Sequence, residues 1–230
     1  REASQLRAQL VESRLQFLRA QLNPHFLSNT MNAVSALVTK DPKAVRRMLA
    51  RLSELLRYTL EAPAEPEVPL EQELAVLTQY LEILEIRFQG RLRTSIAADP
   101  ALMDALVPNL ILQPLAENAM EHGVSQAAGS GSIEVSARRS GDYIVLTVQD
   151  TGASAEAEPT APPTLPTSGG GYGLRHTRDR LEQLYGDDAH LELSPTAEGG
   201  MKAEVTLPYR TRPREPESAG VREPLEPTHA

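Results

Sequence analysis

The chain has 230 residues, 40% of them hydrophobic, and its net charge of −8 argues against a general nucleic-acid binder, because phosphate backbones attract clustered Lys and Arg. It contains no cysteine, which excludes a disulfide framework and thiolate metal sites. It also has no apolar run of the roughly 18 residues that a membrane-spanning helix needs.

The first part of the sequence is predicted to form two helices. Residues 3–39 place apolar side chains near the helical period, and Pro24 interrupts this run directly before His25. Asp41 and Pro42 are residue types typical of an N-cap and a first helical position, so a second helix is expected after them. Two such helices form an antiparallel hairpin, which has too little core to be stable alone. We therefore expect it to pair with a second copy in a four-helix bundle.

The middle of the sequence alternates between connectors and regular structure. The proline-rich stretch 63–69 is predicted to be a short, stiff connector. Leucines at alternating intervals of four and three residues predict an amphipathic helix over 70–88. Residues 92–97 are predicted to form a strand, and residues 108–122 a single helix capped by Gly123.

The remaining sequence is predicted to combine antiparallel strands with one helix. Strands are expected over 132–138, 143–149, 190–193 and 201–207, and a helix over 174–185. Residues 153–168 lack periodicity and are predicted to form a flexible loop, and the composition from residue 211 onward indicates a disordered tail. This mixture predicts an α+β fold with helices on one face of a sheet. Neither a P-loop motif nor a Rossmann glycine pattern is present.

Two adjacent polar residues, Glu117 and Asn118, stand amid apolar residues in the predicted helix 108–122. An asparagine oxygen suits Mg²⁺, which takes few protein ligands and keeps waters and phosphate oxygens. Taken alone, such a pair is more often a solvent-facing stripe on an ordinary helix.

Two glycine-containing segments are candidates for nucleotide contacts. Asp150 and Gly152 directly follow a predicted strand, where an acid can accept the exocyclic amine of adenine; a hairpin turn is the alternative. The glycines at 169–173 precede a helix, whose exposed backbone N–H groups suit phosphate, although a flexible linker has the same composition. Arg178 lies in that helix and either faces phosphate or pairs with neighbouring acids.

His25 is the candidate nucleophile. A neutral imidazole nitrogen attacks a γ-phosphoryl group near neutral pH, although a lone helix histidine is more often an ordinary one. Asn29 follows four residues later and is placed to orient the ring or the phosphate. No acidic residue follows His25 directly, so the sequence does not identify a proton acceptor. Together with a separate polar, glycine-rich pocket, His25 predicts phosphoryl transfer from ATP.

These segments, in this order, resemble one family. Residues 22–29 (Leu-Asn-Pro-His-Phe-Leu-Ser-Asn) resemble the phosphoacceptor box of the LytS/YehU-type sensor histidine kinases. Residues 68–88 are similar to the connecting helix of that family, and residues 107–119 to its N box. Asp150–Gly152 and Gly171–Leu174 stand where its two glycine boxes are expected. The similarity extends from about residue 15 to residue 208.

The resemblance implies a fold and a reaction. It implies an α+β chain in which a helical hairpin, a dimerisation and phosphoacceptor domain, is followed by a Bergerat-type α/β sandwich that binds ATP. The expected divisions are 1–62 (phosphoacceptor), 63–90 (connector and linking helix), 91–210 (ATP-binding) and 211–230 (tail). ATP and Mg²⁺ would phosphorylate His25, and the phosphoryl group would pass to an aspartate of a response regulator, often a DNA-binding one. An alternative is a module that acts mainly as a regulator phosphatase, or as a catalytically weakened scaffold.

The resemblance also assigns roles to residues. His25 and Glu117 would be catalytic, Asn118 would hold Mg²⁺, and Asp150 would recognise adenine. The full set of implied nucleotide contacts is Asn118, His122, Asp150, Gly152, Gly171, Gly173, Leu174 and Arg178. A homodimer is expected, without direct contact to nucleic acid. Because the chain begins at Arg1 without methionine, we expect a cytoplasmic portion of a membrane-anchored bacterial sensor.

Overall fold

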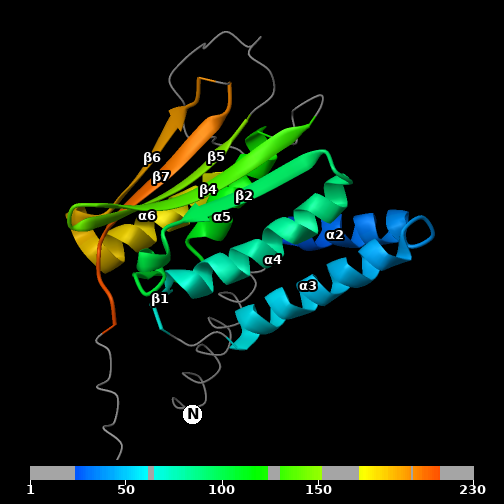
Figure 1. Ribbon diagram of the computed structural model, residues 1–230, viewed down its shortest axis with the longest axis horizontal. Coiled ribbons are helices and arrows are strands. Elements are labelled where there is room, and N and C mark those ends of the chain that lie inside the picture. Colours follow the sequence, from blue (N-terminus) through cyan, green and yellow to red (C-terminus); the bar gives the residue numbers. More distant parts are fainter. Residues whose placement is uncertain (1–23, 62–64, 124–129, 152–170, 198, 213–230) are drawn as a thin grey trace, which may run out of the picture.

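The computed structural model describes residues 24–61, 65–123, 130–151, 171–197 and 199–212 (Figure 1). Its α-helices are α2 (Pro24–Leu37), α3 (Pro42–Glu61), α4 (Leu70–Phe88), α5 (Leu112–Asn118) and α6 (Gly171–Tyr185). A π-helical turn, η2 (Ala119–Gly123), continues α5. The strands are β1 (Glu67–Pro69), β2 (Leu92–Ala98), β3 (Leu106–Pro108), β4 (Gly131–Ser140), β5 (Tyr143–Asp150), β6 (His190–Pro195) and β7 (Met201–Pro208).

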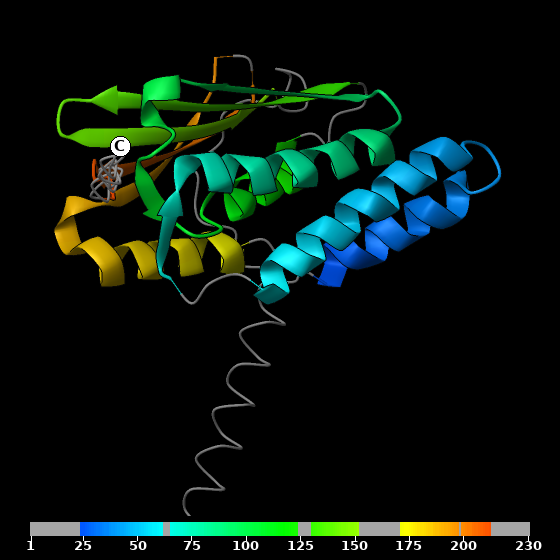
Figure 2. The same cartoon turned by 60° about the horizontal axis from the view of Figure 1, so that its bottom comes forward.

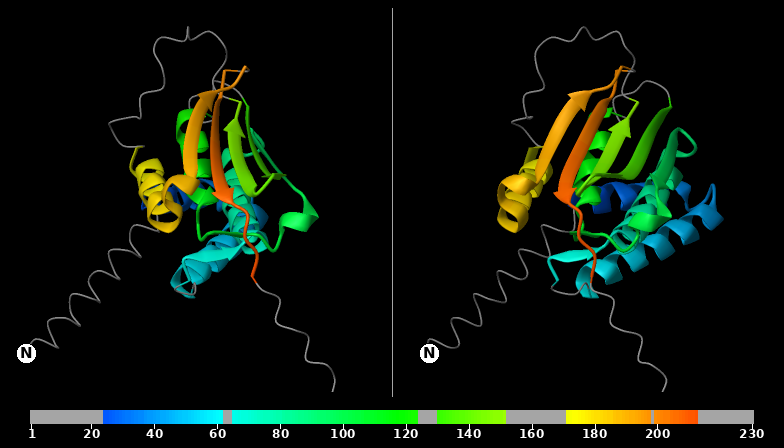
Figure 3. Two further views of the ribbon diagram at one scale, coloured as in Figure 1. Left: turned by 90° about the vertical axis from the view of Figure 1, so that its left-hand side faces the viewer. Right: turned by 60° about the vertical axis from the view of Figure 1, so that its left-hand side comes forward.

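Five strands form one sheet with the order β2-β4-β5-β7-β6, in which only the β2–β4 pair is parallel. Figure 2 shows α4, α5 and α6 beneath one face of this sheet. Alternate residues of β5 supply the core on that side; Ile144, Leu146 and Val148 are all buried. Figure 3 shows α6 (yellow) beside β6 and β7 (orange). The predicted α+β architecture, with helices on one face of a sheet, is therefore confirmed.

The helical hairpin also forms as expected. The Asp41 carboxylate accepts a hydrogen bond from the backbone N–H of Ala44 at 2.9 Å, which is the predicted N-cap of α3. The hairpin packs on α4, where the ring centroids of Phe26 and Tyr80 lie 4.8 Å apart. Of the long helix predicted over residues 3–39, the part before Pro24 lies outside the described residues.

The prediction of one helix over residues 108–122 was wrong at its start. Residues 106–108 instead pair with β1 in a two-stranded antiparallel ribbon, and the α-helix begins only at Leu112. Between them, Leu110 adopts a left-handed backbone conformation with φ of 57°. The stretch 63–69, predicted to be only a connector, likewise ends in the strand β1. Pairing between segments far apart in the sequence outweighs the local helical pattern here.

A buried carboxylate fixes this turn. The two oxygens of Glu73, on α4, accept hydrogen bonds from the backbone N–H groups of Leu110 and Leu112 at 2.7 and 2.8 Å. Burial raises the pKa of Glu73 to about 7, although the backbone donors and the nearby Arg180 oppose the rise. Among the helices that the structure describes, none is both long and apolar enough to cross a membrane.

The raised pKa of Glu73 predicts a specific pH dependence of stability. The native state retains a proton on Glu73 between its ordinary pKa of 4.5 and its native value of about 7. The free energy of unfolding therefore falls as pH rises through this window, by at most about 3 kcal/mol from this group. Glu73→Gln should remove that component in denaturant titrations at pH 5 and pH 8. Glu71→Gln, an exposed neighbour, should retain it.

Candidate functional site

His25 lies in the first turn of α2, with its side chain 68% exposed. Its Nε2 lies 3.0 Å from the amide nitrogen of Asn29, one helical turn later. With the amide nitrogen as donor and Nε2 as acceptor, the contact corresponds to the neutral tautomer that has its proton on Nδ1. On the other side of the ring, Nδ1 lies 3.5 Å from a carboxylate oxygen of Glu121 in η2. The ring is thus held between its own helix and the π-helical turn after α5.

A small pocket of about 100 Å³ opens beside this histidine. It is lined by side chains from α2, α4, α5 and η2: His25, Phe26, Asn29, Tyr80, Arg87, Glu117, Met120 and Glu121. Pockets that hold whole drug-sized ligands measure roughly 300–1,000 Å³, so this one suits a single small group rather than a whole nucleotide.

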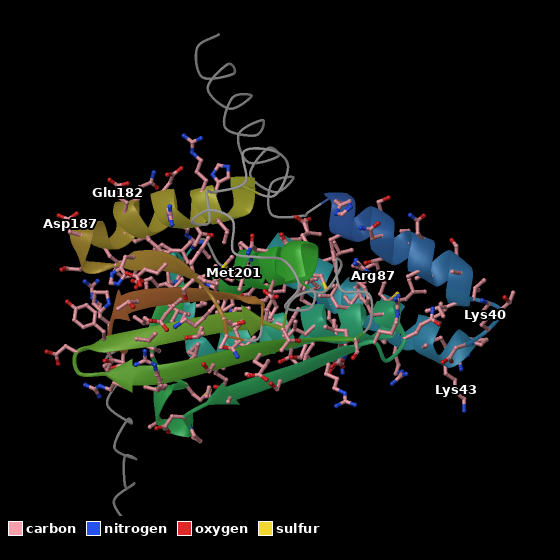
Figure 4. The ribbon with its side chains drawn as sticks, turned by 90° about the horizontal axis from the view of Figure 1, so that it is seen from above. Lys40, Lys43, Arg87, Glu182, Asp187 and Met201 are labelled. Atoms are coloured by element: carbon pink, nitrogen blue, oxygen red, sulfur yellow. The ribbon has the colours of Figure 1, made fainter. Side chains whose placement is uncertain are left out.

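Arg87 is the cation of this pocket, and Figure 4 labels it between α2 (blue) and α5 (green). Burial lowers the pKa of its guanidinium below its ordinary value, yet a guanidinium stays charged at any physiological pH. The guanidinium lies 4.6 Å from the centroid of the Phe88 ring. Within the described part of the chain Arg87 forms no ion pair, so its donors are available to an anion entering the pocket.

Two predicted site residues on α5, Glu117 and Asn118, face different sides of the helix. Glu117 faces the pocket together with Glu121, as expected for residues four apart on one helical side. Glu117 also accepts a hydrogen bond from Gln113 Nε2 at 3.1 Å. Asn118 is buried and does not line this pocket. The structure therefore brings His25 and Glu117 together and places Asn118 on another side of the same helix.

Asp150 lies at the end of the central strand β5 with 2% of its surface exposed. One carboxylate oxygen accepts a hydrogen bond from the backbone N–H of Met201, the first residue of β7, at 3.3 Å. Gly123 lies directly against the other oxygen, since a Cβ added there would be 2.0 Å from Oδ1. The carboxylate is thus enclosed between β7 and the end of η2, and only glycine fits beside it.

The other predicted contacts lie around the start of α6. Gly171 is the first residue of that helix, and a Cβ at Gly173 would make ordinary contact with Pro114 of α5, at 3.6 Å. Leu174 is buried in the core between these helices. Arg178 donates to the backbone oxygen of Leu191 in β6, at 3.3 Å. Gly152, the predicted loop 153–168 and the side chain of His122 lie outside the described residues.

Among the polar residues that line the pocket, sequence reasoning did not identify Tyr80, Arg87 and Glu121. The spacing of Glu121 four residues after Glu117 was the available signal, because both then share one helical face. No group of three or more His, Asp or Glu side chains in the described residues is arranged to hold a metal ion. A metal here would need ligands from its substrate or from water.

Comparisons with known proteins match both halves of the chain. Residues 13–92 match the family model described as histidine kinase. Residues 103–211 match the model described as histidine kinase-, DNA gyrase B-, and HSP90-like ATPase. The boundary between the two matches lies just after α4.

Individual relatives agree with the family models. A sensor protein LytS from Oceanobacillus iheyensis is 34% identical over 220 residues, which cover 91% of this chain and 37% of that relative. The sensor histidine kinase BtsS from Escherichia coli is 32% identical over 89% of this chain and 35% of its own length. The chain therefore spans about a third of these relatives. The catalytic domain of the histidine kinase ThkA superposes with a TM-score of 0.45 at 19% identity, covering 62% of this chain and 93% of that domain.

The contact between Gly123 and Asp150 predicts a sharp response to one added methyl group. Gly123→Ala would drive its Cβ into the buried carboxylate, so it should lower the free energy of unfolding by about 1–3 kcal/mol, as overpacking does. Thermal and denaturant unfolding measure the loss. Gly186→Ala, with open space and a φ of +59°, should cost only the backbone strain of about 1–2 kcal/mol and leave Asp150 in place. Unchanged stability in Gly123→Ala would contradict the enclosed carboxylate.

Proposed function

The chain belongs to the sensor histidine kinase family that includes the LytS proteins, and from this membership we propose that it transfers the γ-phosphoryl group of ATP to His25. The phosphoryl group then passes to an aspartate of a response regulator. The observation that carries the proposal is the position of His25, which lies against η2 and shares a pocket with Glu117 and Arg87. We assign the two parts of the reaction to the predicted units 1–62 and 91–210.

The residues predicted for nucleotide binding fit ATP. Asp150 is a buried acid held at a strand end by Met201, which is a suitable acceptor for the exocyclic amine of adenine. Asn118 offers one amide oxygen on the helix that also faces His25 through Glu117. A single asparagine suits Mg²⁺, because that ion takes its other ligands from phosphates and water. When bound, Mg²⁺ would neutralise negative charge on the phosphates.

Arg87 and the pocket accommodate the transferred group. A pocket of about 100 Å³ matches one phosphoryl group beside the imidazole. The guanidinium of Arg87 supplies donors to its oxygens, and a half-buried cation interacts with them more strongly than one in bulk water. Phosphoryl transfer depends mainly on such positioning and charge stabilisation.

The hairpin has the features of a dimer surface. Met31 on α2 and Val38, the residue directly after this helix, are seven residues apart and are exposed by 43% and 51%. Leu49 and Leu60 on α3 are likewise exposed, by 43% and 61%, and eleven residues apart. Both spacings place the two residues on one helical face, which favours burial against a second copy of the hairpin. We further propose that the longer protein is anchored in the membrane, with this part on the cytoplasmic side.

Autophosphorylation with γ-labelled ATP and Mg²⁺ tests the proposed reaction. Wild-type protein should accumulate acid-labile, alkali-stable label. His25→Gln should lose it because the nucleophile is removed, and Asn118→Ala should lose most of it because the Mg²⁺ ligand is removed. His190→Gln, an exposed histidine on β6, should label like the wild type. Measurable ATP binding without label in the wild type would instead favour a phosphatase or scaffold.

The contact of His25 with η2 lies within one chain, so we propose transfer in cis. Mixed dimers of His25→Gln and Asn118→Ala chains should then stay unlabelled, because neither chain holds both an ATP site and a nucleophile. Mixed dimers of wild-type and His25→Gln chains, the control, should label only the wild-type subunit. Label on the Asn118→Ala subunit would establish transfer between subunits and contradict this proposal.

A further inference from the structure

We propose that Glu121 is the positioning residue of the phosphoacceptor: it orients the His25 ring so that Nε2 is the attacking nitrogen, and it accepts the Nδ1 proton during transfer. This inference rests on the proposed kinase function and adds a residue to it. The residue that follows His25 is Phe26, whose buried side chain packs on Tyr80 and has no proton acceptor. The acceptor must therefore come from another part of the fold.

The side chains around His25 leave few candidates for the group that accepts the Nδ1 proton. Its own helix supplies Asn29, whose amide lies at Nε2. The helix α4 contributes Tyr80 and Arg87, a phenol and a cation, neither of which is a base in these states. Among the described residues that line the pocket, the remaining polar groups are the carboxylates of Glu117 and Glu121.

Between the two carboxylates, the geometry favours Glu121. Its oxygen lies 3.5 Å from Nδ1, and such contacts tighten when substrate binds. Glu117 receives the amide of Gln113 and is adjacent in sequence to the proposed Mg²⁺ ligand, Asn118. The two acids thus lie on one face of α5 and η2 but have different neighbours. Glu121 contacts the His25 ring, whereas Glu117 is adjacent in sequence to the proposed Mg²⁺ ligand.

The transfer step balances with Glu121 in this role. The Nε2 lone pair forms the new N–P bond, while the bond from the γ-phosphorus to the β–γ bridging oxygen breaks and its electron pair leaves with ADP. The ring gains a positive charge, which is removed as the Nδ1 proton passes to the Glu121 carboxylate. Asn29 releases Nε2 as the phosphoryl group arrives. The products are neutral phosphoimidazole, protonated Glu121 and ADP.

The contact between His25 and Glu121 can be tested by substitution without unfolding the protein. His25 and Glu121 are exposed by 68% and 37%, and exposed pairs contribute little to stability. Removing the Glu121 carboxylate therefore leaves the fold intact. A matched control exists in Glu82, on α4, which pairs with Arg51 of α3 at 2.5 Å. Glu82→Gln removes a carboxylate of similar exposure, 39%, that does not line the pocket, so it controls for the general loss of a surface acid.

The experiment compares wild type, Glu121→Gln, Glu121→Asp and Glu82→Gln. In single-turnover labelling, Glu121→Gln should lower the rate of phosphohistidine formation by on the order of 10²-fold. The KM for ATP should be unchanged, because Glu121 is not a predicted nucleotide contact. Glu121→Asp should recover part of the rate, and Glu82→Gln should retain it. Nitrogen NMR of the His25 ring, without ATP, should show the proton on Nδ1 in the wild type and a tautomer mixture in Glu121→Gln.

The outcomes distinguish the role of Glu121 from the kinase function on which it rests. A fully active wild type with an equally fast Glu121→Gln variant would overturn the role of Glu121 and leave the kinase assignment standing. A wild type that binds ATP and forms no phosphohistidine would overturn the kinase assignment. In that case the NMR measurement still decides the geometry, because a wild-type ring protonated only on Nε2 would contradict the contact with Glu121.

Discussion

The arrangement of the whole molecule depends on one buried carboxylate, that of Glu73. A buried carboxylate is costly unless it is satisfied, and Glu73 is satisfied by the backbone N–H groups at the start of α5. That contact fixes α5 relative to α4. It also offsets the cost of the left-handed conformation at Leu110, about 1–2 kcal/mol for a residue with a Cβ. It thereby helps to set the direction of the face of α5 that carries Glu117.

The same short segment is held from other sides. The Tyr58 hydroxyl, from α3, donates to the side chain of Asn109 at 2.8 Å. Arg180, from α6, donates to the backbone oxygens of Asn109 and Pro66. Side chains from three helices, α3, α4 and α6, thus converge on the turn before α5. Because α4 also carries the hairpin through the Phe26–Tyr80 contact, it links the position of His25 to that of α5.

Elements that depend on neighbouring residues could be predicted from the sequence. Elements that depend on contacts between distant segments could not. Asp41 caps α3 through its immediate neighbours, and the leucine spacing of α4 is visible in one stretch, so both were predictable. The helix expected from Pro108 begins late because β3 pairs with β1 and Glu73 caps the turn, and neither interaction has a local signal. The acid beside His25 is hidden for the same reason: Glu121 approaches the ring only once α4 has positioned both helices.

The charges of the pocket explain why such positioning matters. Two carboxylates, those of Glu117 and Glu121, line the pocket of the His25 ring and repel an incoming phosphoryl group, by roughly 1 kcal/mol per charge pair at 4 Å in water and by more where water is excluded. Arg87 offsets part of this repulsion from the α4 side, since it lines the same pocket and forms no ion pair within the described residues. The proposed Mg²⁺ at Asn118 would act from another side of α5. Acids that increase the nucleophilicity of His25 are therefore compatible with an anionic substrate because the Arg87 guanidinium lines the same pocket, and α4 holds this cation in place.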